Sequence, residues 1–318
     1  MIEVIKPGLS TTLQDLGRPG WQAQGVSVGG AADPLALRIA NTIVGNREDA
    51  VGLECALVGP VLRFHVPMWI ALAGACAVGQ PSLRRLYIAA GTDLSLVEIT
   101  RGARLYLVLA GGVQSPPVLG SASTSASSGW PGLAGRALRA GDRLQTAAPR
   151  LSFPARQTYW SASFRFLPSP GTAKTLRVLS GPQWEWFSET VRRTFLGESY
   201  GVSGRSDRMG VRLQGSPLLL AEPRELISEG VAFGSVQVPP DGQLIVLSAE
   251  RQTLGGYPKI ANVITADRSI VAQLRPGDRV RFEMTSPQTA YELLGRQERA
   301  LTTLRAGLAA NDRDHDTH

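Results

Sequence analysis

Short apolar stretches broken by glycine, proline and aspartate dominate the hydrophobic pattern of the chain. Examples are "LRFHVPMWIALAG", "GARLYLVLAGGV", "KTLRVLSG" and "GQLIVLSAE". Runs of this length with turn residues between them are typical of β-strands in barrels or sandwiches rather than of alternating βαβ units. The run "VPMWIALAGACAVG" (66–79) is too short to cross a bilayer and is predicted to be a buried strand. The pattern therefore predicts a mainly β protein.

Three stretches carry helical signals instead. "DPLALRIANTIVGN" (33–46) places Asp33 at the N-cap and Pro34 at the first helical position. "PQWEWFSETVRRTFLG" (182–197) is the second predicted helix. Residues 286–310 begin with Ser-Pro and place leucines on one face, which predicts an amphipathic C-terminal helix packed on the body of the protein or on a partner. Residues 311–318 are predicted to be a disordered tail.

The two halves of the chain resemble one another. "GVSVGGAAD" (25–33) is similar to "GVSGRSD" (201–207), and "LRAGDRLQ" (138–145) is similar to "LRPGDRVRF" (274–282). The spacing predicts a duplicated β-barrel with an insertion in the first copy, and the alternative is chance similarity between glycine-rich loops. A Pro/Gly/Ser linker, "RFLPSPGTAK" (165–174), separates the predicted domains, which are residues 1–165 and 175–285.

Composition narrows the class of protein. The 318 residues are 43% hydrophobic and 19% charged, which is typical of a globular chain with room for two cores. The net charge is +7, but the arginines are scattered and form no basic stripe interleaved with aromatics. We therefore expect no nucleic-acid partner, whereas a small anionic substrate agrees with the charge.

Location and redox state follow from the N-terminus and the cysteines. "MIEVIKPG" has neither a basic n-region nor an apolar h-region, so no signal peptide is expected. Cys55 and Cys76 lie in apolar surroundings and are predicted to be reduced, buried thiols. The sequence predicts a cytoplasmic protein that does not enter a membrane.

The sequence lacks the residues that several common kinds of binding site and active site require. The chain contains no P-loop and no Gly-x-Gly-x-x-Gly between a strand and a helix. Its three histidines, two of them near the C-terminus, do not suffice for a usual zinc or iron site, so no metal is predicted. "GVSVG" (25–29) matches a nucleophile elbow, but Ser27 would have to pair with His65, which lies in an apparent strand.

The stretch "ERQTLGGYPKIA" (250–261) is the densest polar candidate. Gly255 and Gly256 let a ligand approach the backbone closely because neither has a Cβ. The stretch also offers donors for an oxyanion, carboxylate or phosphate, namely Arg251, Gln252, Thr253, Tyr257 and Lys259. Upstream, Glu229 and Gln237 lie on predicted strands. The alternative is a surface hairpin whose polar residues are merely solvated.

Two further loops combine acids with arginines. "YGVSGRSDRMG" (200–210) contains Arg205, Asp207 and Arg208, and "LQDLGRPG" (13–20) contains Asp15 and Arg18. An aspartate held between arginines stays ionised and orients its cations. Together the loops predict a cleft for a polar, planar, partly anionic group, and structural Arg–Asp pairing is the alternative.

Four stretches carry a family resemblance: "LQDLGRPGWQAQGVSVGGAADPLALRIANTIVGN", "RGARLYLVLAGGV", "YGVSGRSDRMGVRL" and "SEGVAFGSVQVPPDGQLIVLSAERQTLGGYPKIA". They resemble the biotin-dependent carboxyltransferase-like family, over roughly residues 3 to 285. Its members include the C subunit of bacterial 5-oxoprolinase (also called allophanate hydrolase subunit 2), KipA, and half of the carboxyltransferase domain of urea carboxylase.

The resemblance implies two cyclophilin-like β-barrel domains with a few short helices. It also implies a companion subunit of the PxpB/KipI kind, with a LamB/YcsF-like third subunit in the oxoprolinase. That complex uses ATP to convert 5-oxo-L-proline to L-glutamate, so the first hypothesis is an ATP-dependent hydrolase subunit that is active in complex. Two alternatives stay open: half of a biotin-dependent urea or amide carboxyltransferase, and a KipA-type regulatory binding protein.

The same resemblance suggests a role for each of the candidate site residues. Lys259, Arg251, Gln252 and Tyr257, with Arg205 and Arg208, are expected to bind the substrate carboxylate or carbonyl and the transferring group, and Asp207 or Glu250 to orient those cations. Three positions depart from the family pattern. Glu250 replaces a usual Asp, Leu254 a usual Thr, and Ala122 an expected Arg, which removes a bidentate anion contact.

Overall fold

The structure is a computed structural model that describes residues 1–149, 161–162, 173–222 and 224–315. The chain divides into two units. The first consists of Met1–Arg18, Gly29–Leu167 and Gln297–His318, and the second of Pro19–Val28 and Pro168–Arg296. Most of the predicted linker falls on residues 163–172, outside the described residues.

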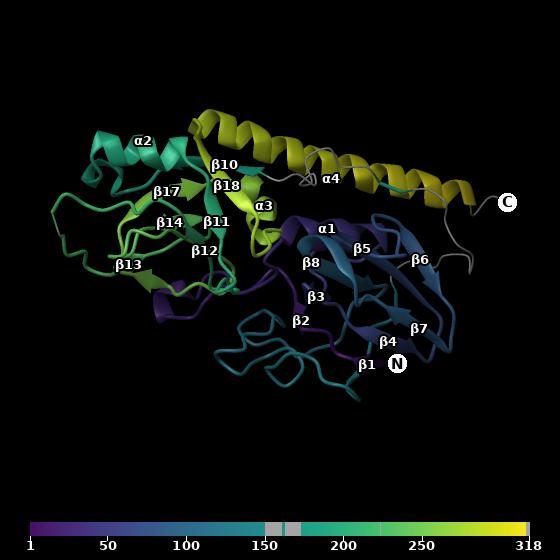
Figure 1. Cartoon of the computed structure of the whole chain (residues 1–318). Helices are drawn as coiled ribbons and strands as arrows, with labels where there is room; N and C mark the ends of the chain where they lie inside the picture. The colour runs from purple at the N-terminus through teal and green to yellow at the C-terminus, as the bar shows by residue number, and fades with distance from the viewer. Residues whose placement is uncertain (150–160, 163–172, 223, 316–318) are drawn as a thin grey trace. The chain divides into compact units, whose positions relative to one another are not determined.

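The first unit is built from two antiparallel sheets (Figure 1). One has the order β7-β4-β1-β9 and the other β2-β3-β8-β5-β6. Their strands are β1 (Ile2–Lys6), β2 (Ser10–Gln14), β3 (Gly52–Ala56), β4 (Val61–Phe64), β5 (Met68–Ala77), β6 (Arg85–Ile88), β7 (Thr92–Ser95), β8 (Ile99–Leu109) and β9 (Arg143–Leu144).

Strand β5 confirms the prediction of a buried strand in residues 66–79, and it is apolar throughout because both of its faces are covered. Ile70 and Leu72 belong to the main core of this unit. Trp69 and Ala71 belong to a second core that contains helix α1 (Pro34–Ile43). The Asp33 side chain caps that helix by accepting from the Ala36 N–H, as predicted.

The second unit contains a closed barrel with the strand order β10-β17-β14-β15-β12-β11-β18. Neighbouring strands of the barrel are antiparallel, except for β10 and β18, which are parallel. Buried aliphatic and aromatic side chains fill it, among them Val236, Ile260 and Phe282. The barrel strands are β10 (Ala173–Ser180), β11 (Tyr200–Val202), β12 (Gly210–Gln214), β14 (Ser235–Gln237), β15 (Ile245–Leu247), β17 (Lys259–Val263) and β18 (Arg279–Met284).

A two-stranded sheet of β13 (Glu229–Gly230) and β16 (Leu254–Gly255) accompanies the barrel. The mainly β prediction is thus confirmed, with one closed barrel in the second unit. In the first unit the described strands form two sheets instead of one closed ring. The short helical elements are η1 (Gln22–Gln24), η2 (Trp184–Trp186), η3 (Thr265–Asp267) and α3 (Arg268–Ala272).

Two predicted helices have different bounds in the structure. Residues 182–197 are not one helix, because Phe187 is extended and Ser188 starts the new helix α2 (Glu189–Gly197) by accepting from the Val191 N–H. The C-terminal helix α4 runs from Pro287 to His315, so its predicted end at residue 310 is too early. The final three residues, 316–318, lie outside the described part of the chain.

One of the two predicted repeats recurs in atomic detail. In the first unit the Arg139 N–H donates to Asp142 Oδ2 at 2.7 Å, Gly141 has φ +84°, and its N–H donates to the Val4 carbonyl at 2.8 Å. The second unit repeats the turn. There the Arg275 N–H donates to Asp278 Oδ2 at 2.9 Å, Gly277 has φ +89°, and its N–H donates to the Val202 carbonyl at 3.0 Å. The two halves therefore share a turn of the same construction.

None of the helices in the described residues has the length and apolar character that a bilayer crossing requires.

Candidate functional site

Strand pairing in the second unit brings polar residues from four strands together. Gln237 on β14 is the register partner of Lys259 on β17. Glu229 on β13 is the register partner of Gly255 on β16. Directly opposed residues of antiparallel strands project from the same face of a sheet. Three predicted candidates, Glu229, Gln237 and Lys259, are thus held by backbone pairing.

Lys259 occupies an irregular position in its strand. The register between β14 and β17 shifts there, because Val236 pairs with Ala261 and the next residue pairs with Lys259, which leaves Ile260 as the extra residue of a β-bulge. The Ile260 carbonyl instead accepts from the Gly181 N–H at 2.9 Å. A bulge of this kind redirects a side chain locally, here that of Lys259.

Gln183 links the bulge to the acid. Its Oε1 accepts from the Lys259 backbone N–H at 3.0 Å, and its Nε2 donates to Glu229 Oε1 at 2.8 Å. The Lys259 ammonium forms an ion pair with the same Glu229 oxygen. Lys259 is buried at 4% exposure, whereas the Glu229 side chain is 42% exposed. The hydrogen bond from Lys259, followed by that from Gln183, lowers the pKa of the Glu229 carboxyl.

The amide nitrogen of Gln237 is buried without a hydrogen-bond partner. The residue is 1% exposed, and Nε2 makes no hydrogen bond in the structure. A Cβ at Gly255 would lie 2.5 Å from that nitrogen and 3.5 Å from Gln252 Nε2. Gly255 thus leaves room for the Gln237 amide, and Gln252 brings a second amide nitrogen to the same glycine. A buried N–H group without a partner is a donor available to a ligand carbonyl or carboxylate.

Arg251 is nearly buried, with 8% exposure. Its Nε donates to the Val231 carbonyl and its Nη1 to the Ser248 carbonyl, both at 3.3 Å. Burial, and secondly the charge of Arg268, lowers the pKa of Arg251 to about 10.

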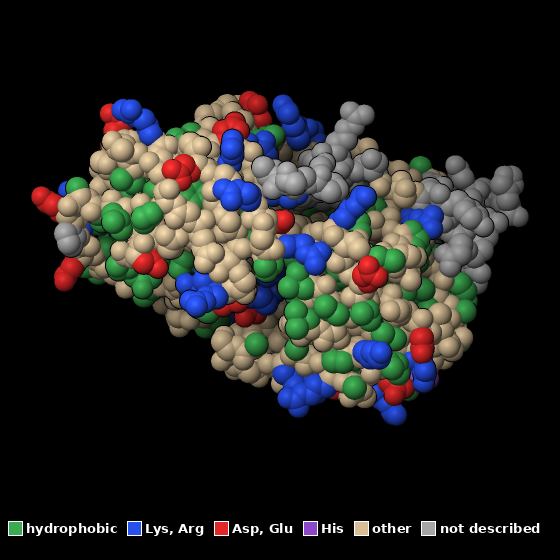
Figure 2. All heavy atoms as spheres, in the orientation of Figure 1, with side chains coloured by type: hydrophobic (Ala, Val, Ile, Leu, Met, Phe, Trp, Pro, Cys, Tyr) green, Lys and Arg blue, Asp and Glu red, His purple; other side chains and the backbone are tan. Residues whose placement is uncertain are grey.

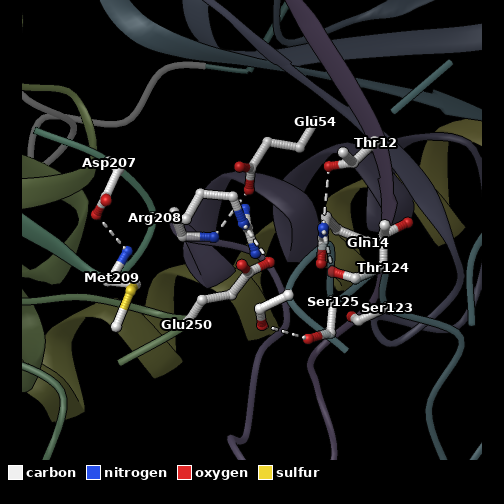
Figure 3. A network of polar contacts seen from close by, with 12 residues as sticks. Thr12, Gln14, Glu54, Ser123, Thr124, Ser125, Asp207, Arg208, Met209 and Glu250 are labelled. Atoms are coloured by element: carbon white, nitrogen blue, oxygen red, sulfur yellow. Dashed lines mark hydrogen bonds and ion pairs between the residues drawn. The ribbon is translucent and has the colours of Figure 1, made fainter. Parts of the chain in front are cut away.

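Arg208 and Glu250 form a pair that Figure 3 shows from close by. Arg208 Nε donates to Glu250 Oε1 at 2.8 Å, and the Glu250 N–H donates to the Arg208 carbonyl at 2.8 Å. Glu250 thus pairs with Arg208 through both its side chain and its backbone, and the proposed role of this acid as an orienting group stays a prediction. Asp207 does not act in this way in the described contacts: its Oδ1 accepts from the N–H groups of Met209 and Gly210 at 2.8 and 3.1 Å. It is a turn-capping acid.

The remaining candidates of this unit lie closer to solvent. Tyr257 is 43% exposed, Gly256 is also exposed, and Arg205 borders a small hollow with Asp241. Thr253 contributes its carbonyl to the Val231 N–H at 3.1 Å.

Asp15 and Arg18 belong to the first unit, where they organise a buried serine loop. The Asp15 carboxylate accepts from the hydroxyls of Ser121 and Ser123 at 2.6 Å each, and from the N–H groups of Gly17 and Ala122 at 2.7 Å each. Arg18 donates to the Ser123 carbonyl at 2.5 Å and lies 5.0 Å from the Trp130 ring centre. Protein donors therefore satisfy Asp15, and Ala122 contributes its N–H to that network.

The charges on the face drawn in Figure 2 are interspersed, with acidic and apolar side chains between the basic ones. Among the described residues, no group of three or more His, Cys, Asp or Glu side chains is arranged to hold a metal ion. The groups gathered at the site are the Gln183 and Gln237 amides, which are able to donate hydrogen bonds, and the Lys259 ammonium, which is able to stabilise a negative charge. Gln183 was missed from the sequence, because nothing local in "SGPQWEW" shows that it reaches Glu229 and Lys259.

The fold and this site define a mainly β protein with a closed barrel, beside which amide groups and a lysine ammonium lie together. Residues 24–284 match the family described as carboxyltransferase domain, subdomain A and B, and the chain belongs to that family. The resemblance read from the sequence motifs is confirmed.

Known proteins resemble the chain over most of its length. The C subunit of 5-oxoprolinase from Escherichia coli (strain K12) is 39% identical over 309 residues, which cover 94% of this chain and 96% of that protein. The Haemophilus influenzae protein of the same name is 37% identical over 96% of this chain and 98% of its own length. The crystal structure of Kluyveromyces lactis urea carboxylase matches with a TM-score of 0.87 at 30% identity, over 95% of this chain and 29% of that one.

Proposed function

We propose that this chain is a subunit of a cytoplasmic, ATP-dependent 5-oxoprolinase and that it activates the lactam carbonyl of 5-oxo-L-proline. The observation that carries the proposal is the buried, unpaired Nε2 of Gln237 beside Lys259. The relatives named as the C subunit of 5-oxoprolinase support the same activity. The chain acts within a complex that includes a PxpB/KipI-like subunit and a LamB/YcsF-like subunit.

The chemistry follows from the charge that develops on the carbonyl oxygen. The Gln237 N–H donates to that oxygen, and the Lys259 ammonium stabilises the negative charge as the amide is activated. Glu229 and Gln183 hold the cation and the bulge in place. Gly255, which has no Cβ, leaves the Gln237 amide the room to keep its position. ATP is the second substrate, which the complex hydrolyses to ADP and phosphate, and a further water molecule adds across the lactam C–N bond to give L-glutamate.

The test uses the complex reconstituted from all three subunits and measures 5-oxoproline-dependent ADP release and glutamate formation. Gln237→Met keeps the side-chain volume and removes the donor, and it is expected to lower kcat/KM about 10²- to 10³-fold. Gln214→Met, on the exposed side of β12, is the matched control and leaves both rates unchanged. Unchanged turnover in Gln237→Met would exclude this amide from the chemistry.

Carboxyl transfer is the second candidate function, favoured by the match to the urea carboxylase structure. In that reaction biotin on a separate carrier would supply the carboxyl group, and the same donors would bind the urea carbonyl. Carboxylation of urea by the complex in the presence of a biotinylated carrier, without 5-oxoproline-dependent ADP release, would support this function. An intact complex that shows neither reaction would favour a regulatory binding protein of the KipA type.

A further inference from the structure

A cavity of about 230 Å³ lies in the second unit, lined by barrel strands β10 and β17, by α3 and by the first turns of α4. Its wall is largely apolar and includes Leu179, Phe233, Ile264 and Leu294. Arg268, the first residue of α3, is the one charged side chain among the described residues that line it. The lining shares no residue with the Glu229, Gln237 and Lys259 site.

The Arg268 guanidinium is not neutralised. Its Cζ lies 4.8 Å from the centre of the Phe233 ring, and its Nε is buried without a hydrogen-bond partner. The neighbouring acid, Asp267, is committed to Arg177, whose backbone N–H, Nε and Nη2 donate to it at 2.8, 3.0 and 2.5 Å. No carboxylate within the described ranges forms an ion pair with Arg268, and burial lowers the pKa of its guanidinium.

A second cation, the buried Arg251, responds to the charge of Arg268, which after burial is the second cause of its lowered pKa. Arg251 donates to two backbone carbonyls at 3.3 Å and, in the described part of the chain, to no carboxylate. Two like charges near one another, one buried and one half-buried, destabilise the folded protein unless an anion compensates them. Two neighbouring arginines without a carboxylate partner favour the binding of an anion between or beside them.

We propose that this cavity binds a small organic carboxylate with an apolar body. The carboxylate accepts hydrogen bonds from the Arg268 guanidinium, which matches it in planar geometry, and Arg251 adds a favourable charge. The hydrocarbon part of the ligand covers the Leu179, Ile264 and Leu294 side of the cavity. Inorganic phosphate fits less well, because it would leave that apolar wall uncovered and needs more donors than one guanidinium supplies. The volume is below the range of drug-sized ligands, which limits the body to about one ring.

The proposal is tested on the full-length chain with benzoate as the probe. Calorimetric titration gives the affinity. Benzyl alcohol serves as the neutral analogue of benzoate, and inorganic phosphate serves as an anion that has no carboxylate. Three variants are compared with the wild type. Arg268→Met removes the cation but keeps contact with Phe233, Ala290→Trp fills the cavity while both arginines remain, and Arg281→Met alters an exposed arginine of β18.

We expect saturable 1:1 binding of benzoate that is at least tenfold weaker in Arg268→Met and in Ala290→Trp and unchanged in Arg281→Met. Benzyl alcohol and phosphate are expected not to compete. Without ligand, Arg268→Met is expected to raise the Tm, because it removes a half-buried charge that has no counter-charge among the described residues, whereas loss of a purely structural arginine would lower it. Equal affinity for benzoate in wild type and Arg268→Met, absence of saturable binding, or binding of phosphate in preference to benzoate would each overturn the proposal.

Discussion

A Cβ added at Gly255 would lie 2.5 Å from Nε2 of Gln237, far inside van der Waals contact. We therefore expect Gly255→Ala to push the Gln237 amide out of its position. Activity of the complex should fall about 10²-fold, close to the loss in Gln237→Met. The free energy of unfolding should fall by only about 1 kcal/mol, because the displaced atom is the end of a side chain.

Gly230, the exposed neighbour of Glu229 on β13, provides the control for this substitution. A Cβ there would meet no atom within 4 Å, and its φ is not in the left-handed region. Gly230→Ala is expected to keep both activity and Tm. Full activity in Gly255→Ala would show that the Gln237 amide does not act on the substrate.

The ion pair between Glu229 and Lys259 predicts a pH dependence of stability. Because the pKa of Glu229 is lower in the folded protein than its ordinary value, the pair stabilises the fold above the unfolded pKa of about 4.5. That contribution is lost as the pH falls through the lower, folded pKa. The Tm difference between wild type and Glu229→Gln should be greatest near pH 7 and shrink below about pH 4.5.

Thermal unfolding from pH 3 to pH 7 measures this difference, with the exposed Glu225→Gln as the comparison. The effect is small, since the Glu229 side chain is 42% exposed and solvent screens the pair. A Tm difference that is constant over this range would contradict the assigned ion pair.

Asp267 and Arg177 form a pair in which the acid is fully buried, with 0% exposure. Asp267→Asn should leave Arg177 without its counter-charge and lower the free energy of unfolding by about 3 kcal/mol. Asp93→Asn is the matched control, because Asp93 forms a bidentate pair with Arg63 at the surface. The Arg63 and Asp93 side chains are 45% and 41% exposed. That variant is expected to change the free energy by less than about 1 kcal/mol in urea titrations. Equal effects would show that burial does not distinguish the two pairs.

The turn that recurs in both units predicts that alanine at its glycine lowers the stability equally and independently in each unit. Gly141 and Gly277 have φ of +84° and +89°, and neither has an atom within 4 Å of an added Cβ. Alanine at either position therefore strains only the backbone, by about 1 kcal/mol. Since the two turns belong to different units, the double variant should show the sum in urea unfolding, and a clear departure from additivity would contradict independent turns.

The two cysteines should differ in reactivity. Burial raises the pKa of the Cys55 thiol to about 12, so very little thiolate is present at pH 8. Cys76 is partly exposed. Iodoacetamide at pH 8, followed by peptide mass spectrometry, should label Cys76 in the native protein and Cys55 only after denaturation. Comparable labelling of both in the native state would show that Cys55 is accessible.

The sequence determined those elements whose signals are local. An aspartate followed by proline predicted the start of α1, and a continuous apolar run predicted β5. The hydrophobic pattern also gave the mainly β class. It failed at residues 182–197, where Ser188 competes as an N-cap inside what reads as one helix.

The tertiary structure decided which polar residues act together. Glu229, Gln237 and Lys259 were candidates from their type, but only strand register and a bulge made them neighbours. Gln183 had no local signal, because its partners lie 46 and 76 residues away in the chain.

Loop conformation likewise decided the roles of the acids. Asp15 and Asp207 read as partners of arginines, yet they accept from backbone N–H groups and, in the case of Asp15, from serine hydroxyls. Residue type in the sequence sets what a side chain is able to bind. Which partner it reaches depends on long-range backbone pairing and burial, which have no signature in any short stretch of sequence.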